Sequence, residues 1–322
     1  MISYKKIIIS AVQIVLNNKY LWFFGLFAAF ISSSIYGKIY GNETSLAESW
    51  GKIKETGVFD FSVFSRMAGL AWQDPSGLAW RLLILLTVLV LGVFIFWLAV
   101  VSQGALINSA AKLYISKKTD FKEGLDEGKI HFWPVCFLKI LEKVIIFFLF
   151  ALLSIPWLLS WYYSFNNSLR ISYYIITVLV LAASILVILI TKYSLFYNVI
   201  KGFRFIDAIK SGLALLKSRL WISLEAGIVI LIINFILSFS ILMLISAIAI
   251  PFVFLMFLFY KLAFVAGLTF VLMLGMLILF IAVAVAGGIL SSLNEVFWTI
   301  FFIVLIKGNP KSFAGSLVVK KS

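Results

Sequence analysis

The chain has 322 residues, of which 63% are hydrophobic and only 12% are charged. Because soluble globular domains carry about a quarter charged residues, this composition excludes a soluble globular protein and indicates a polytopic membrane protein. The formal net charge of +14 does not indicate a nucleic-acid-binding protein, since the cations lie between apolar runs rather than in one basic domain.

Six windows without charge are each close to or longer than the roughly 18 to 20 residues that cross the hydrocarbon of a bilayer. They cover residues 20–37, 82–111, 144–169, 171–191, 226–260 and 262–294. Strands of a membrane barrel would instead be alternating segments of about ten residues. The sequence therefore predicts an all-α fold, a polytopic transmembrane helical bundle of about six spans that forms one integral membrane domain over residues 1–322.

The Lys and Arg residues predict the orientation of this bundle. Most of them lie before the first window, between the second and third, between the fourth and fifth, and after the sixth. Loops rich in Lys and Arg face the cytoplasm. We therefore expect an inner-membrane protein with cytoplasmic termini and a basic C-terminal tail over residues 307–322.

The N-terminal residues 3–19 predict an amphipathic helix on the membrane surface. Its polar stripe is Lys6, Ser10, Gln13 and Asn17, and its apolar side is Ile7, Ile8, Ala11, Val12, Ile14 and Val15. Lys19 and Trp22 follow at the start of the first span, where an indole is favoured at the level of the lipid headgroups.

The outer connection 38–79 is the only long one, and it ends in the turn-forming Asp74-Pro75-Ser76-Gly77. Phe61, Phe64, Ala68 and Trp72 share one helical face within it. We expect part of this connection to lie on the outer leaflet or to cap the bundle.

A cluster of acidic residues and the single histidine lies between the second and third windows: Asp120, Glu123, Asp126, Glu127 and His131. Glu127 and His131 are four residues apart and share a helical face. A metal site or general base is one interpretation, and a solvated face is the other, because Lys122 and Lys129 alternate with the acids. With one histidine and one cysteine in the chain, we expect no metal and no cofactor.

The segment Lys201–Trp221 predicts the clearest surface helix. Ile206, Ile209, Leu213, Leu216 and Leu220 recur on one face, and Arg204, Asp207, Ser211 and Ser218 recur on the other. The apolar stripe is expected to sink to the acyl boundary while the cations meet anionic headgroups. The candidate lipid- or partner-binding surface is Lys210, Lys217, Arg219 and Trp221, together with Lys19 and Trp22.

These segments suggest an internal repeat. Residues 16–22, LNNKYLW, align without a gap on residues 215–221, LLKSRLW, and Phe121–Trp133 is a poorer third copy. We interpret the chain as three units of surface helix, span, outer loop and span, roughly 1–116, 117–200 and 201–310. A chance resemblance is the alternative, because many inner-membrane proteins place basic residues and Trp before a span.

The last third leaves the number of spans open at six or seven. Residues 262–306 carry one charge, Glu295, and are too long for one crossing at about 1.5 Å per residue. Gly287-Gly288 offers a break in this run, although such glycines also mark turns or close helix contacts. Seven spans would place the C-terminal cations outside, so six is preferred.

Polar residues inside apolar runs form the candidate intramembrane site: Glu295, Asn294, Asn234 and Gln103. On one continuous crossing helix, Glu295 would lie near the middle of the membrane, whereas on a tilted helix it would be interfacial. Lys139, Glu142 and Lys143 are interpreted as a snorkelling interfacial cluster, with Lys139 and Glu142 at pairing distance. No nucleophile elbow, phosphate-binding loop or catalytic carboxylate pair is found, so we expect no enzyme.

A basic surface helix, then Asn17-Asn18-Lys19-Tyr20-Leu21-Trp22 with Gly25 inside the span, recurs as Lys217-Ser218-Arg219-Leu220-Trp221. This order resembles a broad group of poorly characterised bacterial multi-span membrane proteins. The group is similar to the membrane domain attached to some glycerophosphodiester phosphodiesterases. The resemblance implies a helical bundle and carries no catalytic residue to this chain.

Two functions remain open. The first hypothesis is a non-enzymatic accessory or organising component of the cell envelope, which binds anionic lipid or a membrane-protein partner. The second is a transporter or channel for a small solute or lipid, suggested by the repeat, by Gly287-Gly288 and by Glu295.

Overall fold

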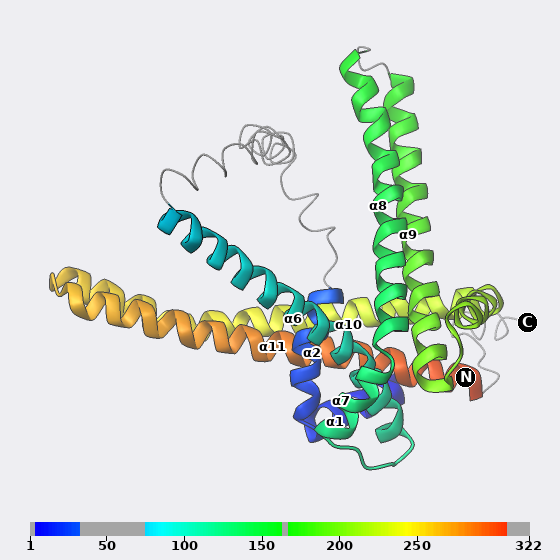
Figure 1. Cartoon of the computed structure of the whole chain (residues 1–322), viewed down its shortest axis with the longest axis horizontal. Helices are drawn as coiled ribbons and strands as arrows, with labels where there is room; N and C mark the ends of the chain where they lie inside the picture. Colours follow the sequence, from blue (N-terminus) through cyan, green and yellow to red (C-terminus); the bar gives the residue numbers. More distant parts are fainter. Residues whose placement is uncertain (1–3, 33–74, 163–166, 308–322) are drawn as a thin grey trace, which may run out of the picture. The chain divides into compact units, whose positions relative to one another are not determined.

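The computed structural model describes residues 4–32, 75–162 and 167–307, and every regular element in these ranges is a helix (Figure 1). The helices are α1 (Tyr4–Asn17), α2 (Tyr20–Ser32), α6 (Pro75–Tyr114), α7 (Phe121–Ile130), α8 (Phe132–Tyr162), α9 (Asn167–Lys201), α10 (Phe205–Lys261) and α11 (Val265–Lys307). The all-α class is therefore confirmed for this part of the chain. Most of the outer connection 38–79, and the tail beyond Lys307, lie outside the described residues.

Four of these helices are long and apolar enough to cross a membrane: α6 from Ala79, α9 from Ile171, α10 and α11. The bent pair α1 and α2 would make a fifth if it counts as one span, with 107° between its two helices. These numbers rest on the length and composition of the described residues. The structure thus supports a multi-span membrane protein, and six spans stays a prediction.

The chain divides into two compact units, one of residues 30–99 and one of residues 1–29 with 100–322. In the smaller unit, α6 begins at Pro75, where the missing backbone N–H of proline is tolerated. The predicted turn at residues 74–77 is therefore in part the start of this helix. From residue 79 to residue 96 the side chains of α6 are exposed, as expected of a lipid-facing helix.

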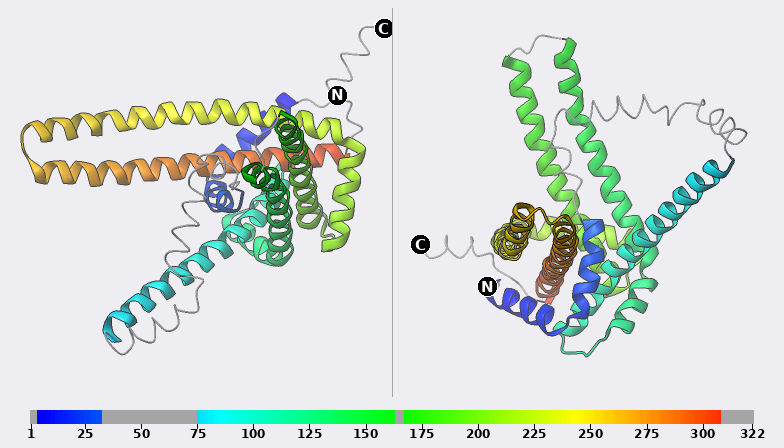
Figure 2. Two further views of the ribbon diagram at one scale, coloured as in Figure 1. Left: turned by 90° about the horizontal axis from the view of Figure 1, so that it is seen from above. Right: turned by 90° about the vertical axis from the view of Figure 1, so that its left-hand side faces the viewer.

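In the larger unit, α8 packs along α9 and α10 packs along α11 (Figures 1 and 2). A short turn joins α10 to α11. The parts of both helices next to this turn expose apolar side chains over most of their length. Only 6% of the most apolar window of α10 is buried. We call these exposed parts the arms. Apolar surfaces of this extent are expected to face lipid.

The C-terminal parts of three helices are instead buried on nearly all sides. They are residues 100–111 of α6, residues 191–199 of α9 and residues 292–305 of α11. A helix buried on every face needs neighbours all round. We call these three segments, with the short helices packed on them, the hub.

Each short helix packs on one of these buried segments. Helix α1 lies along α11, with Ile7, Ala11 and Val15 buried, which confirms three of its predicted apolar positions. Helix α7 lies on α6, where a Cβ at Gly128 would overlap the Val101 carbonyl oxygen. The N-terminal part of α10 lies on α9, where a Cβ at Gly212 would come within 2.7 Å of the Ser194 hydroxyl.

The predicted surface helix before Trp221 is present as residues 205–218 of α10. The helix bends at Arg219, whose φ of −134° and ψ of 30° are not helical, and the rest of α10 leaves in a new direction (Figure 2, left). The predicted apolar stripe is divided, since Leu216 is buried whereas Ile206 and Leu213 are exposed. Small residues cause this difference, because Gly212 lets the backbone approach α9 more closely than a large side chain would.

The expected break at Gly287-Gly288 is wrong, because α11 is one continuous helix of 43 residues. Gly288 is instead a close helix contact, the other interpretation of this pair. A Cβ there would overlap the Trp22 carbonyl oxygen of α2, and a Cβ at Gly25 would overlap the Ser292 hydroxyl of α11. Ser292 also donates a hydrogen bond of 2.7 Å to the Leu21 carbonyl, so α2 and α11 cross at backbone contact.

This crossing predicts opposite effects of alanine at two adjacent glycines. Gly288→Ala should lower the free energy of unfolding by about 1 to 3 kcal/mol, because its methyl group enters an occupied space. Gly287→Ala should be neutral or stabilising by up to about 1 kcal/mol, since its Cβ meets nothing within 4 Å among the described residues and alanine favours a helix. Thermal unfolding of both variants in detergent measures this, and equal melting temperatures would contradict the crossing.

Candidate functional site

An ion pair between α9 and α11 is the most deeply buried charge contact between helices in the described part of the hub. Lys192 Nζ lies 3.2 Å from Glu295 Oε1, and the two side chains are 12% and 3% exposed. The two residues are 103 positions apart in the sequence. Taking both charges out of water is costly, and pairing recovers part of that cost.

Two further contacts surround this pair. The Lys192 ammonium lies 5.2 Å from the centre of the Trp298 ring, within the range of a cation–π interaction. On α8, Lys139 Nζ lies 3.0 Å from Glu142 Oε2, and both side chains are less than a tenth exposed. The predicted pairing of these two residues is confirmed, but they are buried in protein rather than snorkelling to an interface.

Electrostatic interaction links the two pairs, because Lys192 is influenced by both Lys139 and Glu142. The four side chains therefore form one charge cluster, which we name the hub charge cluster, with two cations and two anions. Such a cluster has two chemical capabilities: its Lys192–Glu295 pair holds α9 and α11 in one register, or it relays a proton or admits a cation when a pair opens.

The predicted intramembrane residues are not all brought together. Glu295 belongs to the hub charge cluster, and Asn294 directly precedes it on α11, half-buried. Gly275 of α11 lies against Phe252 of α10. Counting a similar number of residues along each helix from that contact brings Asn234 of α10 to about the level of Asn294 of α11. Gln103 is fully buried on α6, and neither of its amide atoms has a hydrogen-bond partner among the described residues.

Tyrosines join the surface helices to the hub. The Tyr193 hydroxyl of α9 lies 2.6 Å from the Ser223 hydroxyl of α10. Tyr4 of α1 interacts with Glu225 of α10 and stacks on Phe301 at 6.5 Å between ring centres. Helix α1 therefore meets α10 at Glu225, beyond the bend.

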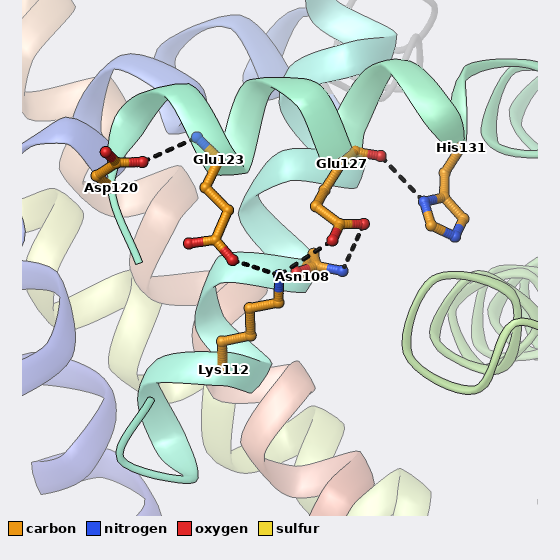
Figure 3. Close-up of polar contacts among 6 residues, drawn as sticks. All are labelled: Asn108, Lys112, Asp120, Glu123, Glu127 and His131. Atoms are coloured by element: carbon orange, nitrogen blue, oxygen red, sulfur yellow. Dashed lines mark hydrogen bonds and ion pairs between the residues drawn. The ribbon is translucent and has the colours of Figure 1, made fainter. Parts of the chain in front are cut away.

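The acidic cluster of α7 forms a bridge to α6 (Figure 3). Lys112 Nζ lies 2.7 Å from Glu123 and 3.0 Å from Glu127, and the Asn108 amide also donates to Glu127. The hydrogen bond from Lys112 holds the pKa of Glu123 below its ordinary value. Asp120 caps α7 by accepting from the Glu123 backbone N–H.

In the structure, the side chains of this cluster contact neighbouring protein groups. The ring of His131 contacts the backbone carbonyl of Glu127 rather than its carboxylate. In the described ranges, no three His, Cys, Asp or Glu side chains are placed to hold a metal ion. The carboxylates of Glu123 and Glu127 are engaged by Lys112 instead.

The candidate lipid-binding residues lie on the surface helices and at their ends. Lys210 and Lys217 are exposed on α10, Arg219 is half-buried at the bend, and Trp221 is 79% exposed. Lys19 is exposed between α1 and α2, and the Trp22 indole N–H donates to the Val15 carbonyl at 2.8 Å. The two groups are thus on separate helices, and each retains an exposed cation.

Sequence reasoning missed Lys192, Trp298 and Tyr193. The positive-inside rule treats Lys192 only as one of the cations between two apolar windows, although it lies before Tyr193 and Ser194 at the end of an apolar run. A lysine nine residues before Lys201, which itself marks the end of the helix, is the signal that could have identified it.

No protein-family model, no curated protein and no solved structure matches this chain. The resemblance to the membrane domain attached to some glycerophosphodiester phosphodiesterases therefore stays a prediction.

The contribution of the Lys192–Glu295 pair can be tested by substituting the two residues singly and together. Lys192→Met should destabilise the protein by about 3 to 5 kcal/mol, because Glu295 is left as an unpaired buried charge. Lys192→Met with Glu295→Met should recover most of that loss, since two apolar side chains of similar size need no partner. Thermal unfolding of the two single variants and the double variant decides this. A double variant as unstable as the singles would show that the pair does not act as a unit.

Proposed function

We propose that the chain is a six-span inner-membrane protein built of three units, each with a surface helix and two spans. Three short helices, α1, α7 and the start of α10, each precede an apolar helical segment and end near Trp22, Trp133 and Trp221. Each packs on the buried end of a neighbouring long helix. This recurring arrangement supports the repeat, and the positive-inside rule supports cytoplasmic termini.

In this proposal the protein is a non-enzymatic accessory or organising component of the cell envelope, and its surface helices bind anionic lipid headgroups. One observation carries it. On α10, Ile206, Lys210, Leu213 and Lys217 follow one another at steps of four, three and four, and all are exposed. Residues at these steps share one helical face.

A face that mixes exposed apolar side chains with lysines suits the boundary between headgroups and acyl chains. Ile206 and Leu213 are 62% and 50% exposed and can enter the acyl region, while the lysine stems lie along it and their ammonium groups reach the phosphates. Trp221, at the bend, adds an aromatic anchor at headgroup level. A membrane-protein partner with an acidic edge would use the same cations.

Neutralising the two lysines should lower the selectivity for anionic lipid. Lys210→Gln with Lys217→Gln should reduce the phosphatidylglycerol that copurifies from mixed phosphatidylglycerol and phosphatidylcholine membranes severalfold, since each lysine near the surface contributes about 1 kcal/mol. Lys117→Gln with Lys118→Gln removes the same charge from the exposed connection after α6 and serves as the control. Lipid mass spectrometry measures the ratio, and equal ratios in both variants and the parent protein would refute this role.

The second candidate function is a transporter or channel, and the hub charge cluster is the observation that favours it. A buried Lys–Glu pair that opens and closes can couple a proton or a cation to a change in helix packing. Glu295 and Lys192 belong to different helices, so breaking their contact would remove the buried ion pair between α9 and α11.

Flux measurements separate this candidate from a structural role of the pair. In liposomes, flux of a small solute should be lost in the double variant Lys192→Met with Glu295→Met, even though its stability recovers. If the double variant keeps the flux of the parent protein, the pair is structural. If the parent protein moves no solute of a panel, the transport function loses its support.

A further inference from the structure

An apolar groove of about 210 Å³ lies between α2 and α11 in the larger unit. Trp22, Phe23 and Leu26 line it from α2, and Phe280, Ile281, Ala284 and Val285 line it from α11. The two helices are in contact at Gly288 and Ser292. The groove begins at Val285, about one turn from Gly288 toward the N-terminus of α11. The groove is therefore the space that opens where the two helices separate.

The residue sizes on α11 explain its shape. Ala284, Gly288 and Ser292 follow at intervals of four and form one stripe of small residues on the side that meets α2. Gly288 and Ser292 contact the backbone of α2, whereas Ala284 lines the groove with the smallest side chain of its lining. Phe280 is 73% exposed and Phe23 is 41% exposed, so the walls are open to the surroundings of the helices.

A cation lies next to Trp22, which lines one end of this groove. Lys19 is in the turn between α1 and α2, and its backbone carbonyl accepts a hydrogen bond of 3.0 Å from the Trp22 backbone N–H. The side chain of Lys19 is exposed. The indole of Trp22 is held in place by its hydrogen bond to the Val15 carbonyl, so the end of the groove nearest Lys19 has a fixed aromatic wall.

We propose that this groove binds one anionic phospholipid, with an acyl chain between α2 and α11 and the phosphate at Lys19. The inference deepens the proposed binding of anionic lipid and rests on it, and it names a specific site and a ligand class. The apolar lining matches a hydrocarbon chain, and the positive charge at the headgroup end matches a phosphate.

The size of the groove favours an acyl chain over a helix of a partner protein. A helix with its side chains is about 10 to 12 Å wide, which a groove of about 210 Å³ cannot admit. A hydrocarbon chain is only one methylene group wide and can lie along the groove from Trp22 toward Phe280. The exposed walls let it enter sideways from the surrounding lipid.

Native mass spectrometry of the full chain tests this site with two probes that share the same acyl chains, phosphatidylglycerol and phosphatidylcholine. We expect one phosphatidylglycerol to be retained after gentle removal of detergent, and phosphatidylcholine not to be. Ala284→Phe should abolish this retention, because its ring occupies the groove. Lys19→Gln should weaken it about five-fold, the effect of one lysine at a membrane surface.

Matched controls lie next to both changes. Val283→Phe adds the same ring on an exposed position outside the groove lining, and Lys118→Gln removes an exposed cation elsewhere. Both should retain the lipid. A phosphatidylglycerol that carries a photoreactive group in its acyl chain should crosslink to residues 22–26 and 280–285 of the parent protein. This measurement carries the test if Ala284→Phe does not fold.

The outcomes separate this site from the surface of α10. Loss of the retained lipid in Ala284→Phe, with retention in Lys210→Gln with Lys217→Gln, supports the groove independently of the α10 surface. Full retention in Ala284→Phe, crosslinks confined to other residues, or equal retention of phosphatidylcholine would each overturn the groove proposal. A loss caused only by the α10 substitutions would overturn the groove and leave the proposed function standing.

Discussion

A charge buried in protein needs a partner of opposite sign, and this requirement joins α9 to α11. Glu295 on α11 pairs with Lys192 on α9, while Lys139 and Glu142 satisfy each other within α8. Opening either pair would leave a charge in surroundings that solvate it poorly. The packing of α9 against α11 is therefore restricted to arrangements that keep the Lys192–Glu295 pair closed.

The surface helices extend this order around the hub. Helix α1 lies on α11, α7 on α6 and the start of α10 on α9, so each buried segment carries one short helix. The helix that opens the chain lies on the last long helix, and this long-range contact links the two ends of the sequence. Glycine makes two of these contacts possible, because Gly128 and Gly212 allow backbone approach that a larger residue would prevent.

The sequence was sufficient where the signal was local. The helical class, the breaks before Trp22, Trp133 and Trp221, and the Lys139–Glu142 pair depend on residues within a few positions of one another. Contacts between distant segments could not be predicted in this way, since nothing near Lys192 indicates that its partner lies 103 residues further on. The side of α10 that is buried was also missed, because hydrophobicity favours Ile206 and Leu213 whereas close packing selects Ala208 and Gly212.

The same physical reasoning explains why Gly287-Gly288 failed as a break. Glycine weakens a helix by about 1 kcal/mol relative to alanine. This is too little to end a helix that packs against its neighbours both before and after the glycine pair. Ser292 bonds to the Leu21 carbonyl beyond this pair, and Val271 and Gly275 are buried before it. A glycine pair in an apolar run is therefore weak evidence for a turn. It is better evidence that the backbone of another helix packs closely at that position.

The length of α11 bears on the choice between the two functions. Its 43 residues extend about 64 Å, roughly twice the thickness of the hydrocarbon, so a single crossing uses only part of the helix. The exposed arm before Gly288 suits the lipid, and Glu295 lies beyond it in the buried hub. The charge cluster there is enclosed by protein, which favours a structural role for it.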